Sequence, residues 1–138
     1  MLRKIVSISY LPREKVRSFE VDDDTVRIVS DMPFISLQSI KDKTSVSCSP
    51  KESDAGILYN IAVSARLLYR ASDLISSTRK GCIVKVVTAD GKSHVLGSYD
   101  FPLRGSVIRN LASTAKDFAG FSLSLAGNQL HDSLLLRE

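Results

Sequence analysis

Two serine–lysine pairs have the spacing of a nucleophile and its base. Ser77 lies three positions before Lys80, and Ser113 lies three positions before Lys116. On a helix, this spacing lets the lysine deprotonate the serine hydroxyl. Serine is abundant in the chain, however, so such spacings arise by chance, and neither the companion motifs of penicillin-recognising enzymes nor a G-x-S-x-G elbow is present. We therefore consider a small serine hydrolase less well supported than the two other functions named at the end of this section.

A second motif, Gly91-Lys92-Ser93, ends like a phosphate-binding P-loop. That loop needs another glycine five places earlier, so that backbone amides can surround the phosphates. Val86 occupies this place. The motif also follows Asp90 between two β-rich runs, a context typical of a hairpin tip and not of a strand-to-helix loop. We predict no nucleotide phosphate site here.

The metal-binding residue types are few and widely spaced. Cys48, Cys82, His94 and His131 could supply four ligands, but no pair has the short spacing of a zinc motif. Two buried, reduced thiols are the favoured interpretation. The acidic run Asp22–Asp24 lacks the glycine and distal glutamate of a calcium loop and indicates a solvated turn. We predict no metal and no cofactor.

Hydrophobic residues recur mainly with period two, which is typical of strands. The clearest run spans residues 56–70, where apolar side chains occupy every second place from Ile57 to Tyr69. A helical interpretation competes, and we favour the strand because β-branched and aromatic residues are frequent and no helix cap precedes the run.

A tight hairpin is predicted around Asp90-Gly91, with a two-residue type I′ loop. In that register Val86 faces Val95, so Val84, Val86 and Val95 share one face, while His94 lies on the face of Val87 and Lys85.

Further short β-like runs and two candidate helices complete the chain. The other predicted strands cover residues 4–10, 15–21, 25–30, 34–38, 44–48, 118–126 and 130–136, with breaks at Pro12 and Ser49-Pro50. Helices are predicted at residues 72–79 and 106–116. The expected fold is all-β or β-dominated: a sandwich or barrel of short antiparallel strands with one or two short helices, forming one domain over residues 1–138.

Composition narrows the classes of function. The chain has 43% hydrophobic and 25% charged residues, the balance of a folded globular protein. No apolar run is long enough to cross a bilayer, and no signal peptide is recognised, so we expect cytoplasmic synthesis and no membrane partner. The net charge of +4 is compatible with nucleic acid. Yet the basic residues are scattered and aromatic residues make up only 7%, so nucleic-acid binding is not favoured.

Two stretches in the second half resemble known proteins. They are Val95-Leu-Gly-Ser-Tyr-Asp-Phe-Pro-Leu-Arg104 and Asp117-Phe-Ala-Gly-Phe-Ser-Leu-Ser-Leu-Ala-Gly127. Residues 81–136 are similar to small virion structural proteins, of tail or neck type, encoded in tailed phages and prophages of gut bacteria. The resemblance implies a structural subunit that becomes part of a virion.

The first of these stretches has the properties of a stiff docking arm. Pro102 fixes its own φ and restricts Phe101 to extended geometry, while Gly97 and Gly105 bracket the segment. The candidate interface residues are Tyr99, Phe101, Pro102, Leu103 and Arg104. An ordinary core-packed connection between strands is the alternative.

These observations predict a non-enzymatic structural subunit that assembles with itself or with other virion proteins through β-edges and this arm. No small-molecule substrate is indicated. The alternative function is a basic domain that binds nucleic acid.

Overall fold

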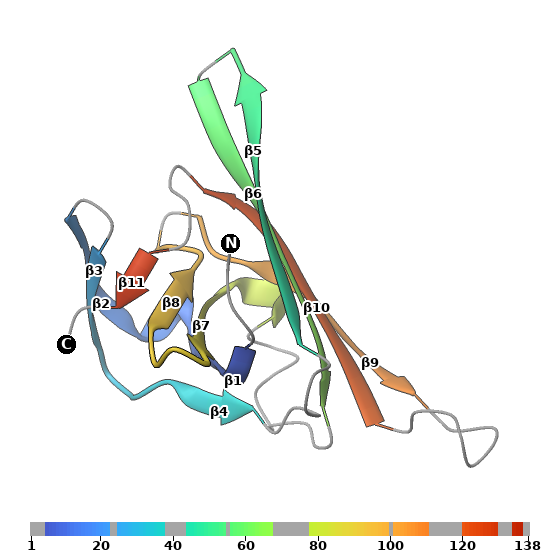
Figure 1. Ribbon diagram of the computed structural model, residues 1–138. Helices are drawn as coiled ribbons and strands as arrows, with labels where there is room; N and C mark the ends of the chain where they lie inside the picture. The colour runs from blue at the N-terminus through green and yellow to red at the C-terminus, as the bar shows by residue number, and fades with distance from the viewer. Residues whose placement is uncertain are drawn as a thin grey trace.

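The structure, a computed structural model, describes residues 5–22, 25–37, 44–54, 56–67, 78–99, 101–110, 120–129 and 134–136 of the 138-residue chain. In chain order their elements are β1 (Ile5–Pro12), the 3-10 helix η1 (Arg13–Lys15), β2 (Val16–Asp22), β3 (Thr25–Ser30), β4 (Ile35–Leu37), β5 (Ser45–Ser53), β6 (Gly56–Leu67), β7 (Cys82–Thr88), β8 (Ser93–Leu96), β9 (Arg104–Asn110), β10 (Gly120–Gln129) and β11 (Leu134–Leu136). The strands form two sheets (Figure 1), which confirms the predicted β-dominated fold class.

The smaller sheet, sheet B, has the strand order β5-β6-β10-β9, and all of its neighbours are antiparallel. Its inward positions on β6 are at most 1% exposed: Ile61, Val63, Ala65 and Leu67. The intervening residues are exposed, so the strand interpretation is confirmed over 56–67. Ile57 is 54% exposed because the β5–β6 hairpin projects beyond the rest of the fold (Figure 1).

The larger sheet, sheet A, has the order β2-β3-β11-β8-β7-β1-β4. Most neighbours are antiparallel, as predicted, but β11 pairs parallel with β3 through Leu135–Thr25 and Leu136–Val26. This exception arises because β11 lies between β3 and β8, which run in opposite directions, so β11 can be antiparallel to only one of them.

Hydrophobic side chains cover both faces of sheet A. One face packs against sheet B, where Tyr10, Val84 and Leu96 meet β6 and β10 residues in the main core. The opposite face carries a second cluster, formed by Leu11, Val16, Val26, Ile83 and Val95. Because successive strand residues point to opposite faces, β1, β7 and β8 contribute side chains to both clusters.

The β7–β8 hairpin is present, but its predicted register is wrong by one residue. Val86 pairs with His94 and Lys85 pairs with Val95, so Val95 lies on the face opposite Val84. The loop has three residues, since the Thr88 amide donates to the Lys92 carbonyl (3.0 Å). Gly91 has φ +84°. Three-residue loops, like the type I′ turn, place a glycine at positive φ, so Asp-Gly fits either loop length.

The helix predicted at 106–116 is wrong where the structure describes it. Residues 104–110 form β9, which pairs with β10 over seven consecutive positions, from Asn110–Gly120 to Arg104–Ala126. Pairing with a neighbouring strand decides the conformation of such a short segment more strongly than its local periodicity does. Residues 111–116 lie outside the described part of the chain.

Other predicted boundaries differ in smaller ways. β1 includes Pro12, and β5 continues through Pro50 instead of ending before it. β5 is an edge strand, and Pro12 is the last residue of β1, beyond the Ile8–Tyr10 stretch that pairs with β4. At both places the sheet tolerates proline because an amide on the open side of a strand has no ladder partner to lose. Of the helix predicted at 72–79, residues 72–77 are outside the described ranges, and residues 78–80 are helical. No helix among the described residues is long and apolar enough to cross a membrane.

Candidate docking site

The segment after β8 is fastened to the body of the protein at both ends. At its start, the Gly97 amide donates to the Gln129 side-chain oxygen (2.8 Å). At its end, Leu103 and Cys82 exchange two backbone hydrogen bonds, each of 2.9 Å. The Leu103 side chain is completely buried in the main core. Leu103 therefore does not present its side chain to a partner, and the segment is not a free arm.

Two glycines allow Pro102 and Leu103 to pack closely against the body of the protein. A Cβ on Gly127 would lie 2.9 Å from Leu103 Cδ2, and one on Gly81 would lie 2.8 Å from Pro102 Cγ. Both distances are shorter than side chains accept, so Pro102 and Leu103 fit against bare backbone. The sequence indicated that Pro102 stiffens the segment. It did not indicate the contacts with Gly81 and Gly127, because these glycines are distant from the segment in the sequence.

Tyr99 and Phe101 remain on the surface, 44% and 41% exposed. They flank a turn in which the Ser98 amide donates to the Phe101 carbonyl (3.1 Å) and the Phe101 amide donates to Ser98 Oγ (3.0 Å). Arg13 fixes this turn from η1: its Nε donates to the Tyr99 carbonyl (2.6 Å), and its guanidinium carbon lies 4.8 Å from the centre of the Tyr99 ring. We call Ser98, Tyr99 and Phe101 together the aromatic turn. Of the five predicted interface residues, Tyr99, Phe101 and Arg104 are exposed, Pro102 is half-buried and Leu103 is buried.

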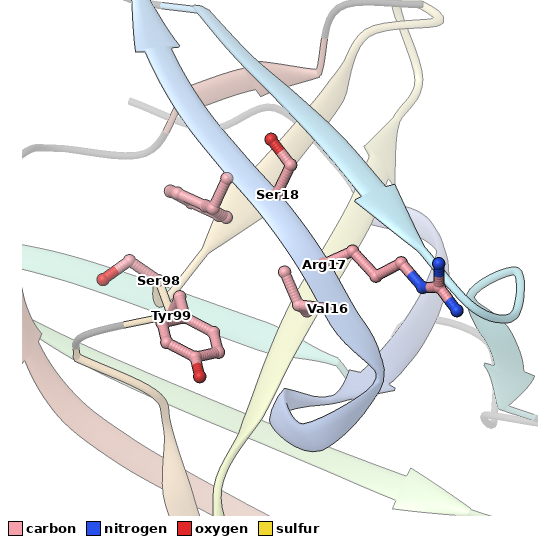
Figure 2. A pocket seen from close by; sticks show the side chains of 6 residues that line it. Val16, Arg17, Ser18, Ser98 and Tyr99 are labelled. Carbon is pink, nitrogen blue, oxygen red and sulfur yellow. The ribbon is translucent and has the colours of Figure 1, made fainter.

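A shallow hollow of about 280 Å³ lies between the aromatic turn and β2 (Figure 2). It is lined by Val16, Arg17, Ser18, Phe19, Ser98 and Tyr99. Arg17 is held by an ion pair with Asp31. The guanidinium of Arg17 extends away from Tyr99 (Figure 2), so the hollow itself combines aromatic surface with two serine residues, which suits a small planar group better than an aliphatic one.

A second exposed feature is the open edge of sheet B. β9 is an edge strand, and its Ile108 side chain is 58% exposed on the outer face. On the inner face, Val107 packs against the main core. The sequence did not indicate this edge, because the segment was assigned to a helix.

The two cysteines are thiols and form no disulfide. Cys82 is completely buried in the main core, whereas Cys48 is only half-buried, so the prediction of two buried thiols holds for Cys82 alone. Among the described residues, no group of three or more His, Cys, Asp and Glu side chains is arranged to hold a metal ion. His131, Ser77, Ser113 and Lys116, which carried other candidate chemistry, lie outside the described residues.

Burial raises the pKa of the Cys82 thiol from 9.0 to about 12. Since the thiolate is the reactive form, we expect Cys82 in the folded protein to resist a thiol reagent at neutral pH and to react on denaturation. Between pH 9.0 and about 12 the unfolded chain releases this proton while the folded chain keeps it, so the unfolding free energy falls as pH rises. Cys82→Ala should remove that part of the decline. Native labelling of Cys82 as fast as that of Cys48 would contradict this assignment.

No family model, curated protein or solved structure matches this chain.

Proposed function

We propose that this protein is a non-enzymatic structural subunit that assembles with copies of itself, or with other virion proteins, through the open edge of sheet B. The aromatic turn supplies a second contact. The virion setting rests on the resemblance of residues 81–136 to phage structural proteins. The main observation that supports assembly is that β9 forms an open, regular edge of sheet B.

The described strands leave four sheet edges, and three of them carry features that discourage pairing. β5 contains Pro50, β4 has three residues, and β2 has a register shift between Val16 and Ser18. Proline, short length and bulges, together with charged side chains, are means by which proteins prevent edge-to-edge association. β9 carries Arg104 and Arg109, but it contains no proline, and it pairs with β10 over seven positions without a shift. An edge of this kind can accept another strand through its main-chain groups.

Two copies of β9 fit one another. If they pair antiparallel about a two-fold axis with Val107 opposite Val107, each Ser106 lies opposite the partner's Ile108. This register joins two four-stranded sheets into one of eight strands and brings the half-buried Val107 side chains together beside both cores. On the outer face, each exposed Ile108 side chain gains cover from its cross-strand neighbours. A symmetric pair of this type is the commonest arrangement of soluble oligomers.

The proposal predicts a charge-dependent loss of assembly. In Ser106→Lys/Ile108→Lys, each new lysine faces a lysine of the other copy, and like charges directly opposite destabilise strand pairing. We expect light scattering to show a shift from the oligomer to the 15.1 kDa monomer. The melting temperature should change little, because both side chains are exposed in the monomer.

The matched control is Ser106→Glu/Ile108→Lys, which places glutamate opposite lysine in the same register and should keep the oligomer. Two results would count against the proposal. One is a wild-type chain that stays monomeric at every concentration. The other is a lysine pair that assembles as well as the wild type does.

A further inference from the structure

Basic residues that are far apart in the sequence gather around Gly81. The Arg13 amide donates to the Gly81 carbonyl (3.2 Å), which places η1 beside this glycine. Arg104 Nε donates to the Lys80 carbonyl (3.4 Å), and a Cβ on Gly81 would lie 3.6 Å from that nitrogen. We call Arg13, Arg79, Lys80 and Arg104 the basic cluster. Arg79, Lys80 and Arg104 are exposed and Arg13 is half-buried, so all four can reach solvent.

The surrounding acidic residues do not balance this charge. Glu14, the residue after Arg13, is exposed on η1 and offsets one of the four positive charges. The whole chain is also basic, with 19 Lys and Arg residues against 15 Asp and Glu residues.

The aromatic turn lies directly beside the basic cluster. Arg13 belongs to the cluster, and its guanidinium carbon lies 4.8 Å from the centre of the Tyr99 ring. Pro102, which follows Phe101, packs against Gly81. Arg13 already holds the Tyr99 ring and carbonyl in place. A ligand that stacks on this ring therefore costs little side-chain conformational entropy. The hollow of about 280 Å³ next to Tyr99 is at the small end of ligand sites, and Ser18 and Ser98 are among its lining residues.

We propose that the basic cluster and the aromatic turn together bind single-stranded nucleic acid. Positive side chains contact the backbone phosphates, and a base stacks at the aromatic turn beside the hollow. This combination of cations with exposed aromatic rings is how proteins hold single strands without reading their sequence. An acidic protein segment would use the charges, but it would have no need of the exposed aromatic rings and the hollow beside Tyr99. The inference is independent of assembly through β9.

The test is the fluorescence anisotropy of a labelled oligothymidylate titrated with the full chain over a range of salt concentrations. Arg79→Gln/Lys80→Gln should weaken binding by about tenfold at low salt and make the slope of log affinity against log salt shallower by about 1.4, or about 0.7 per lost phosphate contact. Tyr99→Ala should weaken binding by about fivefold or more while the slope stays unchanged, because stacking is not ionic.

The matched control is Lys51→Gln/Lys92→Gln, which lowers the net charge of +4 by the same two units at exposed positions on β5 and at the β7–β8 tip. It should bind nearly as the wild type does. Absence of salt-sensitive binding, or equal losses in the control and the Arg79/Lys80 variant, would overturn the proposal. So would polyglutamate binding more tightly than the oligonucleotide, which would assign the surface to an acidic protein. Light scattering of the same samples reports assembly separately, so either proposal can fail alone.

Discussion

Gly105→Ala is expected to destabilise the fold by about 3 kcal/mol or more, because a Cβ at this position has no space. It would overlap the Ser124 carbonyl oxygen and lie 2.7 Å from the Ser124 carbonyl carbon and 2.8 Å from Leu125 Cα. All three atoms belong to the backbone of β10, so no side-chain rotation relieves the overlap. β9 would have to separate from β10, with loss of pairing across this part of sheet B.

Chemical denaturation measures this effect, and Ser106→Ala is the control because Ser106 is the next residue and is exposed. The control should change the unfolding free energy by less than about 0.5 kcal/mol. If Gly105→Ala were no more destabilising than Ser106→Ala, β9 would not pair with β10 in the register described.

Leu103→Ala is expected to cost about 2–5 kcal/mol, the range found when a large side chain is removed from a packed core. Leu103 is completely buried, and its side chain lies against Gly97 and Gly127. Those glycines carry no atoms that can move into the space left behind. The cavity should therefore persist instead of collapsing, which favours the upper part of the range.

Phe101→Ala is the matched control for Leu103→Ala. Both residues belong to the same segment, but Phe101 is 41% exposed, so its replacement should cost much less. Comparison of the two melting curves separates the core-packed connection from a docking arm. Equal and small effects would mean that Leu103 is not a core residue and that the whole segment is peripheral.

Much of the strand content could be predicted because alternation is a local property. Thr25–Ser30 matches β3 residue for residue, and the buried positions of β6 follow the predicted period of two. A strand with one buried face shows that face in its own sequence, whichever strand lies beside it. The order of strands in each sheet is not local, and no pattern in the sequence indicated it.

The wrong predictions, of the β7–β8 register and of the helix at 106–116, arise where one short sequence is compatible with two conformations. Asp90-Gly91 supports a hairpin loop of two or of three residues, and a change of one residue moves Val95 from the face of Val84 to the opposite face. Likewise, Val107 and Ile108 fit a helix face as well as a strand. The partner strand β10 decides between them, and its register with β9 depends on the close approach at Gly105.

The candidate site was predicted only in part. Tyr99, Phe101 and Leu103 were predicted together as interface residues, but Leu103 is buried in the core while the two aromatic residues are exposed. Arg13 contacts Tyr99 across 86 positions of the chain, and Arg104 contacts Lys80 across 24 positions. Basic residues that look scattered in the sequence can therefore form one cluster in the fold.

Hydrogen–deuterium exchange of the backbone amides of β9, followed as a function of protein concentration, tests assembly through this edge most directly. Amides on an open edge exchange quickly, and pairing with another strand protects them. We expect the protection of residues 104–110 to rise with concentration together with the mass from light scattering, while residues 45–53 of the opposite edge of sheet B stay unchanged. A rise in mass without added protection in residues 104–110, or protection gained instead in residues 45–53, would contradict assembly through β9.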